Sequence, residues 1–280
     1  MGCCSTRLSK YTDADLAACA ADGFTFHVLT KADEAEAVAL GVLAFKGAEG
    51  KSPEPSFAYC QGIVAPGDEL PNKKALEYFW GDVATWVHRW LFLQAVTCGG
   101  VVVGCRDAAT KKLVGYAVLF LPATLAMSQE GRMMKIACCE KGMGAIPSFD
   151  KKIFGEKAGP RNLAYEAVPK AKAIVEFKRP FAGKLWKLEV LATDPARQGT
   201  GVGRLLMNAV YALSDAERAP MIVECAGESL PSCYRKLGFT EGEATHELAV
   251  KDDPVTCKLT YLLRNKGAAP AAASSATVVP

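Results

Sequence analysis

The chain has 280 residues, half of them hydrophobic, and a formal net charge of only +3. This length allows one large α/β domain or two small ones. The small charge, without a basic run that contains interleaved aromatic residues, argues against a nucleic-acid-binding protein. No apolar stretch is long enough to span a bilayer. The eleven cysteines show no Cys-x-x-Cys spacing and the three histidines no His-Glu-x-x-His pattern, so we expect free thiols and no metal site.

The first six residues, Met1–Thr6, match the Met-Gly-x-x-x-Ser/Thr signal for N-myristoylation, with Gly2 as the acylated residue. Cys3 and Cys4 beside it are where a second, palmitoyl chain would attach, and two chains anchor a protein much more stably than one. The alternative is a chance Gly-Cys-Cys start in a cysteine-rich chain. No secretory signal is visible. We therefore expect a cytoplasmic protein, with peripheral membrane attachment through residues 1–22 if this signal is used.

Hydrophobic periodicity predicts alternating strands and helices in the domain that follows, residues 23–265. One helix has an aromatic stripe at 3.6-residue spacing, which we interpret as core, and a polar turn joins two strands into an antiparallel hairpin. The tail, residues 266–280, is dominated by Ala, Ser and Pro and is expected to be disordered. Up to the hairpin, the predicted elements are a strand at Phe24–Leu29, a helix at Ala32–Lys46, a loop at Gly47–Pro71, a helix at Lys73–Gln94, and strands at Gly100–Cys105 and Leu113–Leu121.

A long segment without clear strand periodicity, residues 122–184, separates the hairpin from the next strand. It contains twelve basic and six acidic residues, with glycine and proline throughout. Connections of this length are uncommon unless they are functional or partly disordered. We interpret this segment as an insertion over the active site, with a helix at Met127–Glu140.

A glycine-rich run, Asp194–Arg204, joins the strand-like segment Leu185–Thr193 to the amphipathic helix-like segment Leu205–Leu213. A helix N-terminus offers unpaired backbone N–H groups and the positive end of the helix dipole to an anion. Glycines allow a ligand to approach the main chain closely. The spacing fits neither the Gly-x4-Gly-Lys-Ser/Thr loop of nucleoside-triphosphate sites nor the Gly-x-Gly-x-x-Gly loop of dinucleotide sites. We predict a different phosphate-bearing ligand.

The pattern Gln-x-x-Gly-x-Gly, formed by Gln198, Gly201 and Gly203, resembles the coenzyme A pyrophosphate loop of the GNAT superfamily of N-acetyltransferases. The likeness continues downstream at the family's spacing, with a strand, a short helix and a segment similar to Phe-Tyr-x-x-x-Gly-Phe. These are Pro220–Cys225, Ser229–Leu237 and Cys233–Phe239. The motifs cover about Leu185–Phe239, and the N-terminal half matches only in the order of its elements.

The resemblance implies an α/β fold with a central mixed, twisted sheet flanked by helices, best matched over residues 99–265. It implies acetyl-CoA as the cosubstrate, held where two neighbouring parallel strands, Leu185–Thr193 and Met221–Cys225, splay apart. The pantetheine arm would pair with the main chain of Leu191, Ala192 and Thr193. The pyrophosphate loop would comprise Gln198, Gly199, Thr200, Gly201, Val202, Gly203 and Arg204. Arg204 could add a charge-assisted contact or be an ordinary exposed helix arginine.

Two side chains are candidates for proton transfer. Tyr234 occupies the position of the family's tyrosine, which often protonates the departing thiolate, and the alternative is a structural tyrosine under the final strands. Glu189, in the middle of the central strand, is the candidate base. Period-two alternation predicts that Lys187, Glu189, Leu191 and Thr193 share one face, where burial would raise the pKa of the carboxyl. The alternative is a carboxylate paired with Lys187.

Glu224 on the partner strand is the reserve base, and Cys233 is interpreted as a packed cysteine, because the family transfers the acyl group directly. The family's asparagine before the tyrosine segment is missing from Ala226–Leu230. The function implied is transfer of acetyl from acetyl-CoA to a primary amine of a small molecule or peptide. Two alternatives stay open at this point, a non-catalytic acyl-CoA sensor and a nucleotide-binding enzyme that uses the same loop.

Overall fold

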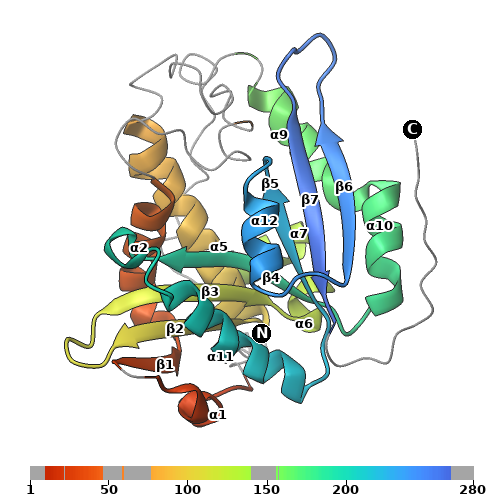
Figure 1. Ribbon diagram of the computed structural model, residues 1–280. Helices are drawn as coiled ribbons and strands as arrows, with labels where there is room; N and C mark the ends of the chain where they lie inside the picture. Colours follow the sequence, from red (N-terminus) through yellow and green to blue (C-terminus); the bar gives the residue numbers. More distant parts are fainter. Residues whose placement is uncertain are drawn as a thin grey trace.

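The computed structural model describes residues 10–21, 23–46, 59, 77–139, 156 and 158–265. The myristoylation signal, most of the predicted loop at 47–71 and the predicted disordered tail lie outside these residues. The described residues form an α/β fold around a seven-stranded sheet with the strand order β1-β2-β3-β4-β5-β7-β6 (Figure 1). This arrangement confirms the mixed sheet flanked by helices that the resemblance implied.

The strands follow the predicted segments closely. Every neighbouring pair is antiparallel except β4 and β5, which are parallel and are joined through α11. The strands are β1 (Phe24–Val28), β2 (Val101–Asp107), β3 (Leu113–Phe120), β4 (Trp186–Thr193), β5 (Met221–Ala226), β6 (Gly242–Leu248) and β7 (Cys257–Arg264). The predicted hairpin is therefore confirmed as β2 and β3.

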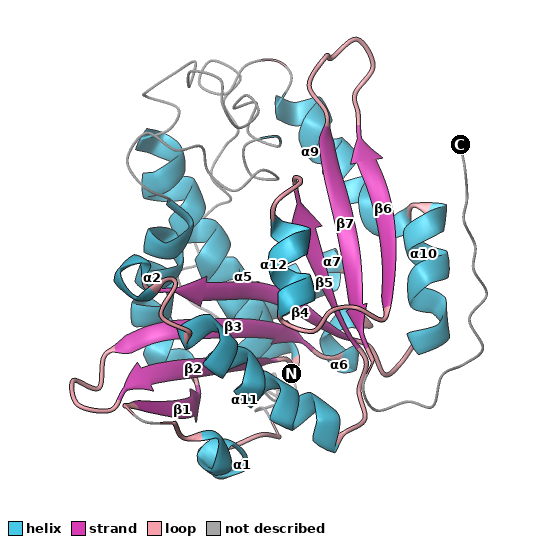
Figure 2. Ribbon diagram, in the orientation of Figure 1, coloured by secondary structure: helices cyan, strands magenta, loops and turns pink. Residues whose placement is uncertain are grey.

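Helices cover both faces of the sheet (Figure 2). On one face, α11 packs over β2–β4 and α12 over β5 and β7. On the other face, α2 and α5 cover β2–β4, whereas α9 and α10 cover β5–β7. The helices are α1 (Asp13–Leu16), α2 (Glu34–Lys46), α5 (Ala84–Cys98), α6 (Pro122–Leu125), α7 (Gln129–Cys139), α9 (Ala158–Ala167), α10 (Lys172–Lys178), α11 (Val202–Ala216) and α12 (Leu230–Lys236).

The long connection between β3 and β4 contains the predicted helix at Met127–Glu140, which the structure places at α7. Its described residues also contain α6, α9 and α10, which the sequence did not predict. Arg161 of α9 forms a two-pronged ion pair with Asp253, at 2.7 and 2.8 Å, so that α9 is fixed to the loop between β6 and β7. Much of this insertion is therefore helical structure packed on the sheet.

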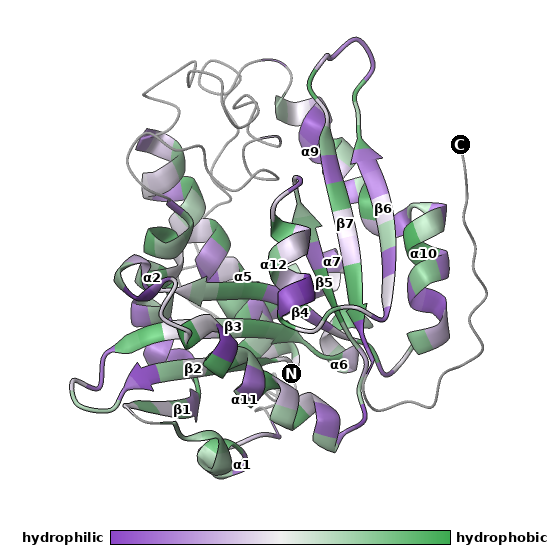
Figure 3. Cartoon of the chain, viewed as in Figure 1, coloured by the Kyte–Doolittle hydropathy of each residue, from purple (hydrophilic) through white to green (hydrophobic). Residues whose placement is uncertain are grey.

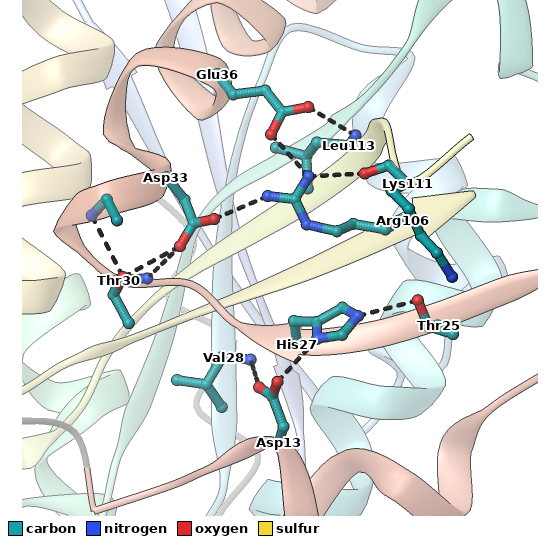
Figure 4. Close-up of polar contacts among 11 residues, drawn as sticks. Asp13, Thr25, His27, Val28, Thr30, Asp33, Glu36, Arg106, Lys111 and Leu113 are labelled. Atoms are coloured by element: carbon teal, nitrogen blue, oxygen red, sulfur yellow. Dashed lines mark hydrogen bonds and ion pairs between the residues drawn. The ribbon is translucent and has the colours of Figure 1, made fainter. Parts of the chain in front are cut away.

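A half-buried arginine joins α2 to the hairpin (Figure 4). Arg106 of β2 donates hydrogen bonds to Asp33 at 2.8 Å and to Glu36 at 2.7 Å, and Glu36 in turn accepts the backbone N–H of Leu113. These carboxylates lie in the first turns before and within α2, where negative charge also favours the helix dipole. The contacts fix α2 on the sheet face beside β3.

In the described part of the chain, three groups of buried apolar side chains pack against the sheet, one on the face covered by α11 and two on the opposite face. One group lies under α11 and α12, one under α2 and α5, and one under α9 and α10. The central strands β2 and β3 are largely apolar along their length, while charged residues lie on the outward helix faces (Figure 3). Within the described residues, no helix combines the length and apolar character needed to cross a membrane.

Candidate active site

The parallel strands β4 and β5 separate part-way along their length. They pair at Trp186 with Met221 and at Lys187 with Ile222, and the last pair is Leu188 with Val223. Beyond this point β4 pairs only with β3, and β5 only with β7. One edge of β4, from Glu189 to Thr193, therefore has no neighbouring strand among the described residues. This splay is the opening that the sequence predicted between these two strands.

A β-bulge in β4 changes the predicted orientation of its side chains. Val118 pairs with Val190 and the next residue, Leu119, pairs with Leu188, so Glu189 has no partner across the ladder. An extra residue reverses the alternation of faces. Before the bulge Leu188 faces α11, whereas after it Leu191 does. The predicted common face for Lys187, Glu189, Leu191 and Thr193 is therefore wrong, because period-two counting does not detect a bulge.

The glycine-rich run forms a tight turn from the end of β4 into α11. Gly199 and Gly201 have φ values of +77° and +95°, which disfavour other residues, and Gly201 precedes the first residue of the helix. The backbone N–H groups of Gly199, Gly201, Val202, Gly203 and Arg204 donate to no acceptor in the described part of the chain. A Cβ added at Gly199 or Gly201 would meet nothing within 4 Å. The turn thus presents free donors to open space.

Two ion pairs and a side-chain cap hold this turn in place. Asp194 accepts the N–H of Ala196 at 3.0 Å and pairs with Lys112 at 3.2 Å. Arg197 pairs with Asp107 at 3.1 Å. Lys112 and Asp107 both belong to the β2–β3 turn, so the hairpin supports the glycine-rich run. The turn is organised before any ligand binds, which reduces the entropic cost of binding.

Comparison with known proteins agrees with this geometry. Residues 165–241 match the acetyltransferase (GNAT) domain family, and this segment includes β4, the glycine-rich turn, α11, β5 and α12. The resemblance to the GNAT superfamily that the motifs indicated is therefore confirmed over this segment. No curated protein has a significantly similar sequence.

Solved structures similar to the chain include three acetyltransferases. One is described as histone acetyltransferase HPA2 and related acetyltransferase from Corynebacterium glutamicum, with 18% identity, a TM-score of 0.45, and coverage of 89% of this chain and 99% of that one. The ribosomal-protein-S18-alanine N-acetyltransferase from Escherichia coli has 10% identity, a TM-score of 0.40, and coverage of 89% and 98%. The mosquito protein described as arylalkylamine N-acetyltransferase like 5b has 15% identity, a TM-score of 0.40, and coverage of 85% of this chain and 99% of that one.

The residues predicted to bind the acetyl donor lie together at the open end of the splay. Leu191, Ala192 and Thr193 form the last residues of β4, and the turn follows immediately. The Gln198 side chain donates to the carbonyl of Thr193 at 3.3 Å, and the Thr200 hydroxyl donates to the carbonyl of Arg197 at 2.7 Å. These two polar side chains therefore stabilise the turn itself. Arg204 is exposed in the first turn of α11.

Tyr234 lies in α12, on the sheet face that also carries α11. It is half-buried, it packs against the core group under α11, and its ring meets Phe239 edge-on with centroids 5.9 Å apart. Cys233 beside it is exposed on α12. The interpretation of Cys233 as a packed cysteine is therefore wrong, because the positions of this short helix that face the core, Pro231 and Tyr234, are three residues apart and Cys233 lies on the solvent side.

Glu189 forms the ion pair that the sequence had left as the alternative reading. Its Oε2 lies 2.8 Å from Lys187 Nζ and receives no further hydrogen bond, and the side chain is 17% exposed. No described residue forms a hydrogen bond with Oε1. Lys187 therefore supplies a countercharge that the predicted base role did not include.

Glu224, the reserve candidate, is more completely enclosed. Tyr165 of α9 donates to its Oε1 at 2.7 Å, Tyr261 of β7 donates to its Oε2, and Lys187 Nζ lies 3.5 Å from Oε2. Burial acts to raise the pKa of Glu224, but Lys187 and the two tyrosines outweigh it, and the net shift is downward. Sequence reasoning missed both tyrosines, because neither lies in a recognisable motif.

Proposed function

We propose that the protein transfers the acetyl group of acetyl-CoA directly to a primary amine. The observation that carries this proposal is the combination of the β4–β5 splay with a rigid turn of free backbone donors at its open end. A splayed strand edge offers main-chain hydrogen bonds to an extended amide-containing chain, and the helix N-terminus offers donors to a diphosphate. Acetyl-CoA combines both chemistries in one molecule. The match to the GNAT family supports the same ligand.

In the proposed complex the donor lies along one arm of the splay. The pantetheine amides would pair with the free edge of β4 at Leu191, Ala192 and Thr193. The pyrophosphate would accept the N–H groups of the turn between Gly199 and Arg204, five of which have no acceptor in the described residues. These contacts use main-chain atoms, so the required property of the turn is its backbone shape and the absence of bulky side chains.

The reaction requires a neutral amine, and Glu189 is the proposed acceptor of its proton, directly or through a water molecule. The amine nitrogen attacks the thioester carbonyl carbon, and the C–S bond then breaks. The departing thiolate takes a proton, for which Tyr234 is the proposed donor, and the second proton that the attacking nitrogen loses returns through solvent to the phenolate. The amide and free coenzyme A are the products, without an acyl-enzyme intermediate.

The acceptor is a primary amine of a small molecule or a peptide. The excess of basic residues in the insertion, twelve against six acidic ones, disfavours a polycation because like charges repel. An amine that also carries a carboxylate or phosphate group is therefore the preferred acceptor class.

Two measurements test this function. Calorimetric titration with acetyl-CoA and with ATP, side by side, should show binding of acetyl-CoA alone. A panel of amines, with release of free thiol as the readout, should then show turnover with at least one acceptor. Binding of ATP instead of acetyl-CoA, or acetyl-CoA binding without transfer to any amine, would contradict the proposal.

A further inference from the structure

A group of charged and phenolic side chains lies at the vertex of the splay, on the face opposite α11 and α12. Lys187 belongs to the last stretch of paired β4, and Glu189 and Glu224 are the first residues past the final pair on β4 and β5. Their side chains are 18%, 17% and 13% exposed. They are partly desolvated and still reachable from solvent. If acetyl-CoA occupies the splay, this vertex lies beside the reacting carbonyl.

The two carboxylates at the vertex differ in what remains available to a ligand. Glu224 accepts hydrogen bonds on both oxygens, from Tyr165 and Tyr261. Protonating it would break at least one of these bonds, so Glu224 is a fixed anion. Glu189 has Lys187 on one oxygen only, and no described residue forms a hydrogen bond with the other. Glu189 is thus the carboxylate that can accept an N–H from an acceptor amine.

Lys187 connects these two carboxylates, at 2.8 Å from Glu189 and 3.5 Å from Glu224. The other cation nearby is Lys178 of α10, which lies over the Tyr261 ring at 4.5 Å and forms no ion pair with a described residue. Burial, and then repulsion by Lys187, lower the pKa of Lys178 to about 8, whereas the pKa of Lys187 is raised by its two carboxylates despite its partial burial. Of these two lysines, Lys187 is the one that forms ion pairs with the two carboxylates.

We propose that Lys187 is a positioning residue for the transfer reaction, which holds Glu189 ionised and in place at the vertex with one oxygen left for the acceptor amine. This inference rests on the proposed function. Without the ammonium, two carboxylates would share a partly desolvated site. Because their charges repel, one of the two would stay protonated up to a higher pH than a single carboxylate does. Because Glu224 has its two phenol donors, that proton would go to Glu189. A protonated Glu189 cannot take the amine proton.

The test is the pH profile of kcat/KM for acetyl transfer in Lys187→Met. The acid limb is the part of this profile in which kcat/KM falls as the pH is lowered. We expect this limb to lie at least one pH unit higher in the variant, so that kcat/KM at a given acidic pH falls about tenfold and recovers at higher pH. Lys187→Arg, which keeps the charge, should return the limb toward its wild-type position. Lys184→Met, which removes an exposed lysine just before β4, is the matched control and should leave the profile unchanged.

A second pair of variants keeps the inference testable if Lys187→Met alone does not fold. The first variant, Glu224→Gln, removes the fixed anion. The second is a double variant that combines Lys187→Met with Glu224→Gln and so removes one positive and one negative charge together. The acid limb of the double variant should lie about one pH unit above that of Glu224→Gln, because Glu189 still loses its countercharge. The affinity for acetyl-CoA should stay within about twofold in every variant, since the glycine-rich turn is unchanged.

An acid limb that does not move in either comparison would overturn the inference, and Lys187 would then be a structural ion-pair partner only. That result leaves the wild-type transfer activity intact, so it is distinct from failure of the proposed function. A wild-type protein that binds acetyl-CoA and transfers to no amine would overturn the proposed function and the role of Lys187 with it.

Discussion

Glu189 and Glu224 lie on opposite arms of the splay, each one residue past the last pair between β4 and β5. Both carboxylates are within 4 Å of the single ammonium of Lys187. Within ion-pair distance the vertex therefore has one positive and two negative charges, a balance that favours the approach of a protonated amine. The same strand separation thus opens the edge of β4 for a donor and places negative charge where an amine acceptor would arrive.

Gly203→Ala should weaken acetyl-CoA binding without weakening the fold. An added Cβ at this position would lie 3.6 Å from Thr193 Oγ1, which is an ordinary contact, and nothing closer is present. Alanine is also a better helix residue than glycine by about 0.5–1 kcal/mol. The methyl group would, however, occupy space between the turn and a bound pyrophosphate. We expect the dissociation constant measured by calorimetry to rise about tenfold or more, with an equal or higher melting temperature.

Gly159→Ala is the matched control for this substitution. Gly159 also lies in a helix, α9, and a Cβ there would meet nothing within 4 Å. It should gain similar stability and bind acetyl-CoA as the wild type does. Equal affinities in the two variants would mean that the ligand does not approach the main chain at Gly203.

Tyr234→Phe should reduce turnover and leave acetyl-CoA binding unchanged. Removing the hydroxyl takes away the proposed proton donor for the thiolate, while the ring can still pack edge-on against Phe239. Loss of a general acid typically costs about 10²–10⁴-fold in rate. Steady-state kinetics and calorimetry on the same preparation separate the two effects. Full activity in this variant would assign Tyr234 to packing alone.

The shape of the glycine-rich turn was predictable from the sequence because it depends on local residues. A turn between a strand and a helix depends on glycines at fixed positions, and Gly199 and Gly201 have the positive φ values that such a turn requires. The amphipathic pattern of α11 also indicated that one face of this helix is buried. The parallel pair and its splay followed from the family resemblance carried by these residues.

The contacts of the charged group at the vertex were not fully predictable, because its residues meet only through the tertiary structure. The β-bulge that leaves Glu189 unpaired depends on the register with β3, which no local pattern encodes. Tyr165 and Glu224 are 59 positions apart, and Tyr261 is a further 37 positions along the chain. A helix in the insertion and the strand β7 bring their hydroxyls to the same carboxylate. Pattern counting along one segment cannot show such a convergence.

Gly41→Ala should destabilise the protein through overpacking. A Cβ at this position in α2 would come within 2.3 Å of the Tyr116 hydroxyl and 2.7 Å of His88 Nδ1, both of them buried. Forcing atoms into a packed core typically costs about 1–3 kcal/mol, which exceeds the helix-propensity gain of alanine. Urea unfolding should show this loss. Adding Tyr116→Phe removes the nearest atom and should recover part of it; no recovery would place the strain elsewhere.

His88 should make the protein less stable in mild acid. It is 2% exposed in α5, and burial lowers its pKa from 6.5 to about 4. Between these pH values the unfolded chain binds a proton on His88 that the folded protein does not, so the free energy of unfolding falls as the pH falls. The full shift corresponds to about 3 kcal/mol, most of which should be lost between pH 6.5 and 4.

A neutral substitution, His88→Asn, tests this effect. Its amide can still face the Tyr116 hydroxyl, which lies 3.4 Å from His88 Nδ1, although the smaller side chain should lower stability at every pH. Urea denaturation of both proteins at several pH values from 4 to 7 gives the measurement. The stability difference between wild type and variant should narrow toward pH 4, because only the wild type carries this proton linkage. A constant difference across the range would show that His88 becomes charged in the folded protein at little cost.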